Sequence, residues 1–443
     1  MPKRVFACLS KVYQFGGERV IIFDMNELQN QSAYTGDDWI EDILNRSQEL
    51  EISQIEQAVI SKLVELIYGN SITLPDRRLA LAAVFDLLAT AEYYRNVGHV
   101  GWLYCPTDDT PLLLYPYTNV CPRCVLKNEF VFHKANKPQS GSIGAKTSRL
   151  LAVFLQALFL KNNRTVEVRK GVEPVDILLV DRMGRPTAVM FAEIKAAPLV
   201  TLPLAVTSQL LTREKDGKVV NIGHRTTDHA ALYGSQLNML LPNSLNEGST
   251  WELTPFGNKE NATDELWAYR SLLELLETKP AFLGEYISFW ESALRSYEQK
   301  SQTNIFWLTN ACGQPLPRPT NWPRRKGASG FESISDSKTS VGMDRTDDLK
   351  KATYQVLKIG TEGNPSSKFH FRVGIISNIH AVRHYEDYLT ALQDVIWTRS
   401  QNRSVKTASD LASNTPIFNL FDGIIALTQS QVRDKWVSEI FNF

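Results

Sequence analysis

The sequence predicts a mixed α/β protein with a mostly helical N-terminal part. Apolar residues recur at three- and four-residue steps between positions 52 and 94, which is typical of amphipathic helices. Between 146 and 194, a helical pattern is followed by three short strand-like runs, and the same α/β order resumes after position 344. The chain has 443 residues. At roughly 150 residues per domain, this length predicts about three domains.

The composition is that of an ordinary globular chain. Apolar residues make up 43% and charged residues 22%, which excludes a disordered, collagen-like or disulfide-stapled protein. Lys and Arg together number 48, as do Asp and Glu, so the formal net charge is zero. This balance argues against a protein that coats DNA without specificity. It still allows a nucleic-acid enzyme, because one basic cleft can be balanced by acidic surface elsewhere.

The sequence carries no sign of a membrane segment or an export signal. The longest apolar stretch, residues 150–160, is about half of the roughly 20 residues that a bilayer requires. The N-terminal residues lack the apolar core and cleavage site of a signal peptide. Five cysteines are too few for a disulfide framework in a chain of this length. We therefore expect a cytoplasmic protein without a membrane partner.

The elements follow in order along the chain. Gly16 and Gly17 separate two strand-like runs and predict a hairpin. Helices are predicted at 52–68 and 78–94, the second one starting after Pro75. We assign residues 1–100 to a mostly helical domain for recognition or dimerisation.

The central part has a helix–strand–strand–strand pattern. A helix is predicted at 146–161, and strands at 165–169, 175–181 and 188–194. Further helices and strands then alternate with a long Pro-, Gly- and Ser-rich loop at 312–343. The predicted helices are 228–241, 263–277, 284–298, 347–359, 385–397 and 430–441, and the predicted strands are 304–308, 369–376 and 423–427.

The segment 173–195 carries the most informative pattern, EPVDILLVDRMGRPTAVMFAEIK. Asp176 starts one predicted strand, and Glu193 and Lys195 end the next. Side chains alternate between the faces of a strand, so Glu193 and Lys195 share a face while Ile194 points into the core. Pairing as a hairpin brings Asp176 beside Glu193, and two carboxylates are hard ligands suited to Mg²⁺. Lys195 then lies beside the metal site, where it can orient water or offset transition-state charge.

This segment resembles the PD-(D/E)xK nuclease superfamily, the fold of most type II restriction endonucleases. By position, Asp176 matches the family's Asp, Glu193 its acidic residue and Lys195 its lysine. The first motif is spelled Pro174-Val175-Asp176, with a valine inserted. The resemblance implies that these three residues are catalytic and that Asp176 and Glu193 hold Mg²⁺.

The resemblance also implies an α/β (α+β) fold class. Its restriction-endonuclease-like core has a central mixed sheet flanked by helices, and we assign it residues 141–200 and 344–443. The mostly helical domain and a small zinc-ribbon-like module at 101–140 are added to this core. Residues 201–343 are predicted to be an insertion with helices and a long basic loop.

Auxiliary residues are expected on the two helices of this core. In the family, a helix after the ExK strand often packs beside the site and contributes Gln or Lys. Here the helix at 347–359 offers Gln355 and Lys351, with Tyr354 beside them. The helix at 146–161 has no acid, and Gln156 is the only polar residue in its middle.

Three cysteines have the spacing of a metal site. Cys121 and Cys124 form a C-x-x-C knuckle around a proline, and Cys105 lies sixteen positions upstream. The segment is similar to a zinc ribbon that lacks one cysteine, and a tetrahedral Zn²⁺ needs a fourth ligand. His133 is the best local choice, with His99 and Asp108 as alternatives. The spacing predicts a structural zinc, against three cysteines that are unliganded or redox-active.

The remaining histidines are predicted to be non-catalytic. They form no metal-spaced pair on a convincing helix, and they are His224, His229, His380 and His384.

Two basic segments are candidates for phosphate contact. One precedes and enters the helix at 146–161, and the other is a basic-aromatic part of the loop at 312–343. The predicted DNA-binding residues are Lys134, Lys137, Lys146, Arg149, Arg318, Arg324, Arg325 and Lys326. Such runs are also common as solvated surface.

The function predicted from these patterns is a Mg²⁺-dependent, site-specific endonuclease of double-stranded DNA, a bacterial type II restriction enzyme. It would hydrolyse phosphodiester bonds to leave 5′-phosphate ends. A homodimer is expected because the sites of this class are usually palindromic, and a DNA methyltransferase is expected as its genetic partner. Two alternatives stay open: a non-catalytic zinc-containing DNA-binding protein, and a structure-specific repair or mobile-element nuclease of the same fold.

Overall fold

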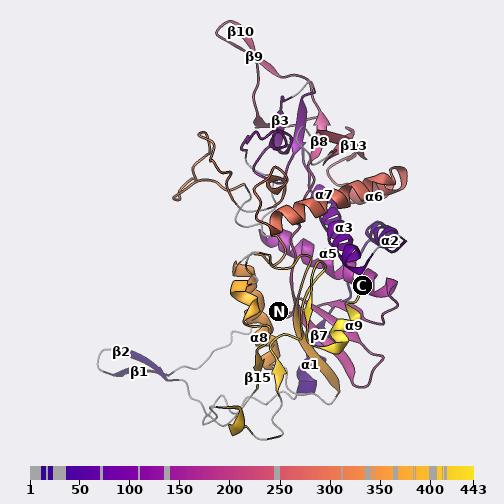
Figure 1. Cartoon of the computed structure of the whole chain (residues 1–443), viewed down its shortest axis with the longest axis vertical. Coiled ribbons are helices and arrows are strands. Elements are labelled where there is room, and N and C mark those ends of the chain that lie inside the picture. The colour runs from indigo at the N-terminus through magenta and orange to yellow at the C-terminus, as the bar shows by residue number, and fades with distance from the viewer. Residues whose placement is uncertain are drawn as a thin grey trace.

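The computed structural model describes most of the chain and has a mixed α/β architecture with several sheets (Figure 1). The described residues are 11–15, 18–22, 36–69, 73–107, 110–133, 140–243, 250–310, 313–334, 341–344, 346–362, 368–382, 384, 386–398, 407–411, 413 and 417–443. Lys134, Lys137 and Asp108, three residues singled out from the sequence, lie outside the described residues. The predicted N-terminal hairpin is confirmed, since β1 (Lys11–Phe15) pairs antiparallel with β2 (Glu18–Ile22).

The first large sheet is mixed and has six strands in the order β18-β17-β14-β7-β6-β5. Three of them form an antiparallel meander: β5 (Glu167–Lys170), β6 (Ile177–Asp181) and β7 (Thr187–Lys195). The others are β14 (Phe369–Ser377), β17 (Gly423–Ala426) and β18 (Gln431–Val432). β14 runs parallel to β7 along its whole length, so residues far apart in the sequence meet at the centre of this sheet.

Helices cover both faces of the mixed sheet. Side chains that alternate along β6 and β7 belong to two separate hydrophobic clusters. One face, with Leu179 and Ile194, packs in the same cluster as residues of α5 (Ser140–Lys161). The opposite face, with Leu178 and Phe191, shares its cluster with α8 (Thr346–Glu362) and with α1 (Gly36–Arg46).

The helix α5 is unusually apolar. Its segment Gly141–Lys161 is long and apolar enough to cross a membrane. However, 56% of the most apolar 18-residue window in this segment is buried inside the protein, and the helix packs against α2, α3, β5 and β7. These contacts are those of a core helix.

The second large sheet has the strand order β11-β3-β4-β8-β12-β13. Its strands are β3 (Trp102–Cys105), β4 (Leu112–Tyr115), β8 (Leu204–Thr207), β11 (Arg225–Thr227), β12 (Leu237–Pro242) and β13 (Trp251–Gly257). It therefore combines residues from the predicted zinc module at 101–140 with residues from the predicted insertion at 201–343. The two segments share one sheet, where the sequence predicted separate units.

A helical layer lies between the two sheets (Figure 1). It consists of α2 (Gln54–Gly69), α3 (Leu74–Tyr94), α6 (Trp267–Thr278) and α7 (Ala281–Glu298), together with α5. From Ala80 to Tyr94 every residue of α3 is buried. The helices predicted for the N-terminal region are thus confirmed, and α3 forms the centre of the molecule.

Two predicted elements are wrong, and two are shorter than expected. The helix at 228–241 is replaced by β12, because Gly234 takes a φ of 78° that ends helical backbone, and the apolar residues that follow are buried on both faces of a sheet. The strand at 304–308 is a short 3₁₀ turn, Phe306–Leu308. The last helix, α9, spans only Lys435–Ile440. Within the helix predicted at 385–397, the structure has a short π-helix, Glu386–Thr390, and the strand β15 (Ile396–Trp397).

Candidate functional site

The hairpin of β6 and β7 brings the predicted acidic pair together. The antiparallel register pairs Ile177 with Ala192, so the next pair outward is Asp176 and Glu193. Asp176 is held in place by its Oδ2 atom, which accepts a hydrogen bond of 2.9 Å from the backbone N–H of Ile194. Ile194 itself is buried in the core, as the alternation along the strand predicted. The two carboxyl groups therefore lie side by side on one face of the sheet.

A tight loop before β6 positions Asp176. Its two ends are joined by a hydrogen bond of 2.8 Å from the Gly171 N–H to the Asp176 carbonyl oxygen. The loop closes so tightly that a Cβ atom on Gly171 would lie only 2.2 Å from the carbonyl oxygen of Val175. Only glycine permits this close approach of backbone to backbone.

The electrostatics of the site depend on the close approach of three charged groups. Burial and the neighbouring Asp176 carboxylate raise the pKa of Glu193 to about 7, while the ion pair with Lys195 opposes this rise. Lys195 Nζ donates to Glu193 Oε1 on the same face of β7. Two carboxylates this close repel each other unless a proton or a cation lies between them. The arrangement is therefore suited to binding a cation.

Solvent can reach this site from one side. The side chain of Glu193 is 7% exposed and that of Lys195 is 20% exposed, whereas Asp176 is an exposed residue at the strand end. A cavity of about 340 Å³ beside Asp176 lies on the α5 side, where Ser148 and Arg149 line it; neither Glu193 nor Lys195 lines this cavity. Solvent access to the carboxyl pair therefore comes from the exposed Asp176 and the half-buried Lys195.

The predicted auxiliary residues fall into different environments. Gln355 lies on α8, which covers the sheet face that carries Glu193, and its amide oxygen is buried without a hydrogen-bond partner among the described residues. Lys351 on the same helix is exposed. Gln156 instead forms hydrogen bonds with the backbone at strand β5. Its Oε1 accepts a hydrogen bond of 2.8 Å from the Val168 backbone N–H. Both ends of its amide bind that strand, since its Nε2 donates to the Val166 carbonyl oxygen at 3.2 Å. Gln156 therefore stabilises β5.

A second cluster of chemically reactive side chains lies at the edge of the other large sheet. The ligand atoms of Cys105, Cys121, Cys124 and His224 all lie within 4.8 Å of one another. Cys121 precedes the short helix α4 (Pro122–Val125), which carries Cys124, and Cys105 ends β3. All three cysteines are buried.

The fourth member of this cluster was not predicted. The sequence favoured His133, but this residue is absent from the cluster, and His224 occupies the fourth position. The reason is strand pairing: β11 pairs antiparallel with β3, Arg225 opposite Tyr104, so the next pair outward is His224 and Cys105. The alternative His99 is likewise not among the four residues.

The distances in this cluster suit a tetrahedral metal ion. Cys105 Sγ and Cys124 Sγ are 3.8 Å apart, and Cys124 Sγ and His224 Nε2 are 3.1 Å apart. A disulfide requires about 2.05 Å between sulfurs, whereas two thiolates at about 2.3 Å from one tetrahedral zinc lie about 3.8 Å apart. Hydrogen bonds from Cys121 and Cys124 lower the pKa of Cys105, and burial raises the pKa of Cys121. The cluster can hold a metal ion such as zinc.

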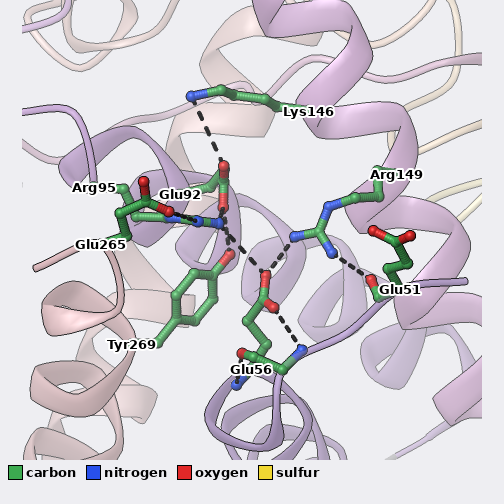
Figure 2. Close-up of polar contacts among 9 residues, drawn as sticks. Glu51, Glu56, Glu92, Arg95, Lys146, Arg149, Glu265 and Tyr269 are labelled. Carbon is green, nitrogen blue, oxygen red and sulfur yellow. Dashed lines mark hydrogen bonds and ion pairs between the residues drawn. The ribbon is translucent and has the colours of Figure 1, made fainter. Parts of the chain in front are cut away.

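Two of the predicted DNA-binding cations are engaged inside the protein (Figure 2). Arg149 on α5 pairs with Glu56 and donates a hydrogen bond of 2.9 Å to the Glu51 carbonyl oxygen. Lys146 lies 3.9 Å from Glu92 Oε1, and Glu92 also accepts from Tyr269 and Arg95. Carboxylates of α2 and α3 thus pair with Lys146 and Arg149, the two members of this basic segment that the structure describes. Their predicted contact with DNA stays a prediction.

The second basic segment is exposed but partly ordered by its own aromatic residues. The guanidinium of Arg318 lies 3.7 Å from the ring centroid of Phe331, and Arg324 stacks on the same ring at 5.2 Å. Trp322 is buried and anchors the loop, because its Nε1 donates to the Glu332 carbonyl oxygen at 2.6 Å. Arg325 and Lys326 are exposed at the tip.

Comparison with known proteins places the chain in no group. No family model, no curated protein and no solved structure matches it.

Proposed function

We propose that the protein is a Mg²⁺-dependent endonuclease of double-stranded DNA. One observation carries the proposal: the carboxyl groups of Asp176 and Glu193 meet at the end of the β6–β7 hairpin, with Lys195 paired to Glu193 on the same face. The mixed sheet flanked by α5 and α8 is the architecture that the resemblance to PD-(D/E)xK nucleases implies. This architecture supports the assignment of residues 141–200 and 344–443 to a nuclease core.

The donor set fits a hard divalent cation. Asp176 and Glu193 supply carboxylate oxygens, which Mg²⁺ prefers over nitrogen and sulfur. Burial and the Asp176 carboxylate raise the pKa of Glu193 despite its ion pair with Lys195, so a divalent cation between the two carboxylates would be favourable. Mg²⁺ bound by these two residues would supply Lewis-acid chemistry for the attack of water on a phosphodiester.

The remaining chemistry belongs to the protein's own side chains. Lys195 places a positive charge beside Glu193, where it can orient the attacking water and offset the negative charge that develops on the phosphate. Gly171 and the backbone N–H of Ile194 fix the position of Asp176. Hydrolysis on this arrangement leaves a 5′-phosphate and a 3′-hydroxyl end.

The rest of the proposal concerns biological setting. We assign the enzyme to the bacterial type II restriction class, acting in the cytoplasm as a homodimer on palindromic sites, with a DNA methyltransferase as its genetic partner. The Cys105, Cys121, Cys124 and His224 cluster is proposed to hold a structural Zn²⁺. These assignments rest on the resemblance and on the size of the chain beyond the catalytic core.

The test is cleavage of supercoiled plasmid and linear duplex DNA with and without Mg²⁺. The wild type is expected to cut only with Mg²⁺, giving fragments with 5′-phosphate ends. Glu193→Gln is expected to cut at least about 10²-fold more slowly while still binding DNA. Glu167→Gln, a change of another carboxylate on the same sheet, is the matched control and should cut like the wild type.

The products separate the alternatives. Discrete fragments indicate site specificity, whereas nicking or a smear indicates a structure-specific nuclease. A wild type that binds duplex DNA but never cuts it is a non-catalytic DNA-binding protein, and the proposal would then be wrong. Equal cleavage by wild type and Glu193→Gln would also reject this site.

A further inference from the structure

A two-stranded ribbon projects from the second large sheet (Figure 1). It consists of β9 (Thr212–Lys215) and β10 (Lys218–Asn221), which pair only with each other. All four residues of β9 are exposed, and so are three of the four in β10. An isolated two-stranded hairpin that buries no core is only marginally stable in water. The side chains of this ribbon are therefore available for contact with another molecule.

The charges of the ribbon are sorted onto one face. The register pairs Lys215 with Lys218 and Arg213 with Val220, and directly opposite residues share a face. All three cations of the two strands thus lie on the same face, whereas the only acid, Glu214, lies on the other. No ion pair joins these cations to a described carboxylate.

The pair of lysines is unfavourable in the isolated protein. Like charges directly opposite on paired strands destabilise a sheet, because their Cβ atoms lie only about 4.5–5.5 Å apart. The turn between them, Asp216-Gly217, has φ values of 51° and 71°, which hold the two strands in tight register. The turn therefore keeps the two ammonium groups together, an arrangement that becomes favourable when a polyanion lies against them.

The base of the ribbon is fixed to the folded protein by Leu211 and Ile222, which pack against the main hydrophobic cluster. Leu211 N donates to the Tyr104 hydroxyl at 2.8 Å, and Ile222 N donates to the Leu211 carbonyl oxygen at 2.8 Å. Two residues further on, His224 belongs to the cysteine–histidine cluster. A metal ion held there would therefore hold the base of the ribbon and set the direction in which it projects.

We propose that the β9–β10 ribbon is a DNA-contacting arm, with its cationic face, Arg213, Lys215 and Lys218, lying against the phosphates of a duplex. This inference rests on the proposed function and names a surface that the substrate uses outside the cleavage site. A two-stranded ribbon fits the major groove of B-DNA, which is about 12 Å wide. The opposite face presents Val219, which is 75% exposed, as an apolar contact for bases.

The experiment uses the full chain carrying Glu193→Gln, so that DNA stays intact, and measures duplex binding over a range of salt concentrations. The test variant adds Arg213→Gln, Lys215→Gln and Lys218→Gln. The control instead adds Lys161→Gln, Arg295→Gln and Lys300→Gln, which removes the same charge from exposed cations elsewhere. A third protein carries Lys215→Arg and Lys218→Arg and keeps the charge.

If the ribbon contacts DNA, the test variant should bind duplex DNA at least about 10-fold more weakly near 0.1 M salt. The slope of the logarithm of the binding constant against the logarithm of the salt concentration should be reduced by about 2 to 3. The control and the arginine variant should bind like the parent. Equal metal content and thermal midpoint in all four proteins show that the fold is intact. If the parent binds duplex DNA and the test variant binds equally well, the arm is rejected while the nuclease proposal stands. If the parent binds no duplex DNA, or prefers RNA, and the wild type does not cut, both fail.

Discussion

The carboxylate site and the cysteine–histidine cluster are built by the same device but serve different chemistry. In each, the decisive residue lies one position beyond a paired strand: Asp176 opposite Glu193, and His224 opposite Cys105. The first set offers oxygens and suits a hard cation, while the second offers sulfur and nitrogen and suits zinc. Strand register thus creates both sites, and the donor atoms decide which metal each can take.

The two sites also differ in access. The three cysteines are buried in a hydrophobic cluster, as expected of a closed structural site. Asp176 is exposed and Lys195 is half-buried, so a substrate can approach the carboxylate pair. The difference in access agrees with the proposed division, a structural metal in one site and catalysis in the other, and the following changes test that division.

The largest effect is expected from removing His224. His224→Ala should lower bound zinc from one equivalent to less than about half, because a tetrahedral site loses one of four ligands. The free energy of unfolding should fall by several kcal/mol, since zinc contributes about 10–16 kcal/mol in small zinc-dependent domains. Metal analysis and chemical denaturation measure both.

The matched control for this change is His133→Ala, because the sequence alone favoured His133 as the fourth ligand. It should keep its zinc. Loss of zinc from His133→Ala but not from His224→Ala would reverse the assignment.

The two clusters differ in how much of their geometry could be predicted from the sequence. Asp176 and Glu193 are only 17 positions apart, so the turn between two adjacent strands is enough to join them. His224 lies 119 positions after Cys105 and reaches it only because β11 adds to β3. Nothing local in the sequence specifies that long-range pairing.

Long-range pairing also explains what else the sequence missed. The spacing of Lys146 and Arg149 on their helix gives no sign of Glu92 and Glu56, which come from helices more than 50 positions away. The β9–β10 ribbon, in contrast, had a local signal that was overlooked. The dipeptide Asp216-Gly217 is a strong hairpin signal when extended runs flank it.

The second-largest effect is expected from replacing Lys195, and it should change the rate of DNA cleavage without changing the zinc content. Lys195→Met should reduce the rate of DNA cleavage by about 10²–10³-fold, because it removes the positive charge beside the carboxyl pair. Zinc content should not change, since the cluster lies on the other sheet. Single-turnover cleavage with saturating enzyme measures the rate. Full activity in Lys195→Met would place catalysis elsewhere in the molecule.

A smaller effect is expected in the pH dependence of stability without added Mg²⁺. Because the pKa of Glu193 is raised from 4.5 to about 7, the folded state binds a proton there in a range where the unfolded state does not. The free energy of unfolding should therefore fall by about 2–3 kcal/mol as pH rises from about 4.5 to 7, and level off above it.

Glu193→Gln should lose this slope, and denaturation curves across that range measure the difference from the wild type. Burial also raises the pKa of Asp86 to about 7 and gives a slope of the same sign, but Asp86 is present in both proteins and cancels. Saturating Mg²⁺ should flatten the wild-type slope. Identical slopes in the two proteins would show that Glu193 does not titrate in this range.

The smallest effect is expected from Gly171→Ala. The new Cβ would lie 2.2 Å from the Val175 carbonyl oxygen, so the loop that carries Asp176 must shift. If Asp176 has the proposed catalytic role, a shift of this kind should slow cleavage about 10-fold, with loss of about 1–2 kcal/mol of stability. Gly144→Ala on α5 is the matched control, because nothing lies within 4 Å of its Cβ position. Alanine is also the better helix former, so the control should gain up to about 1 kcal/mol and keep full activity. If Gly171→Ala were as active as Gly144→Ala, the position of Asp176 would not depend on the tight loop, and only the register of β6 and β7 would remain to place it.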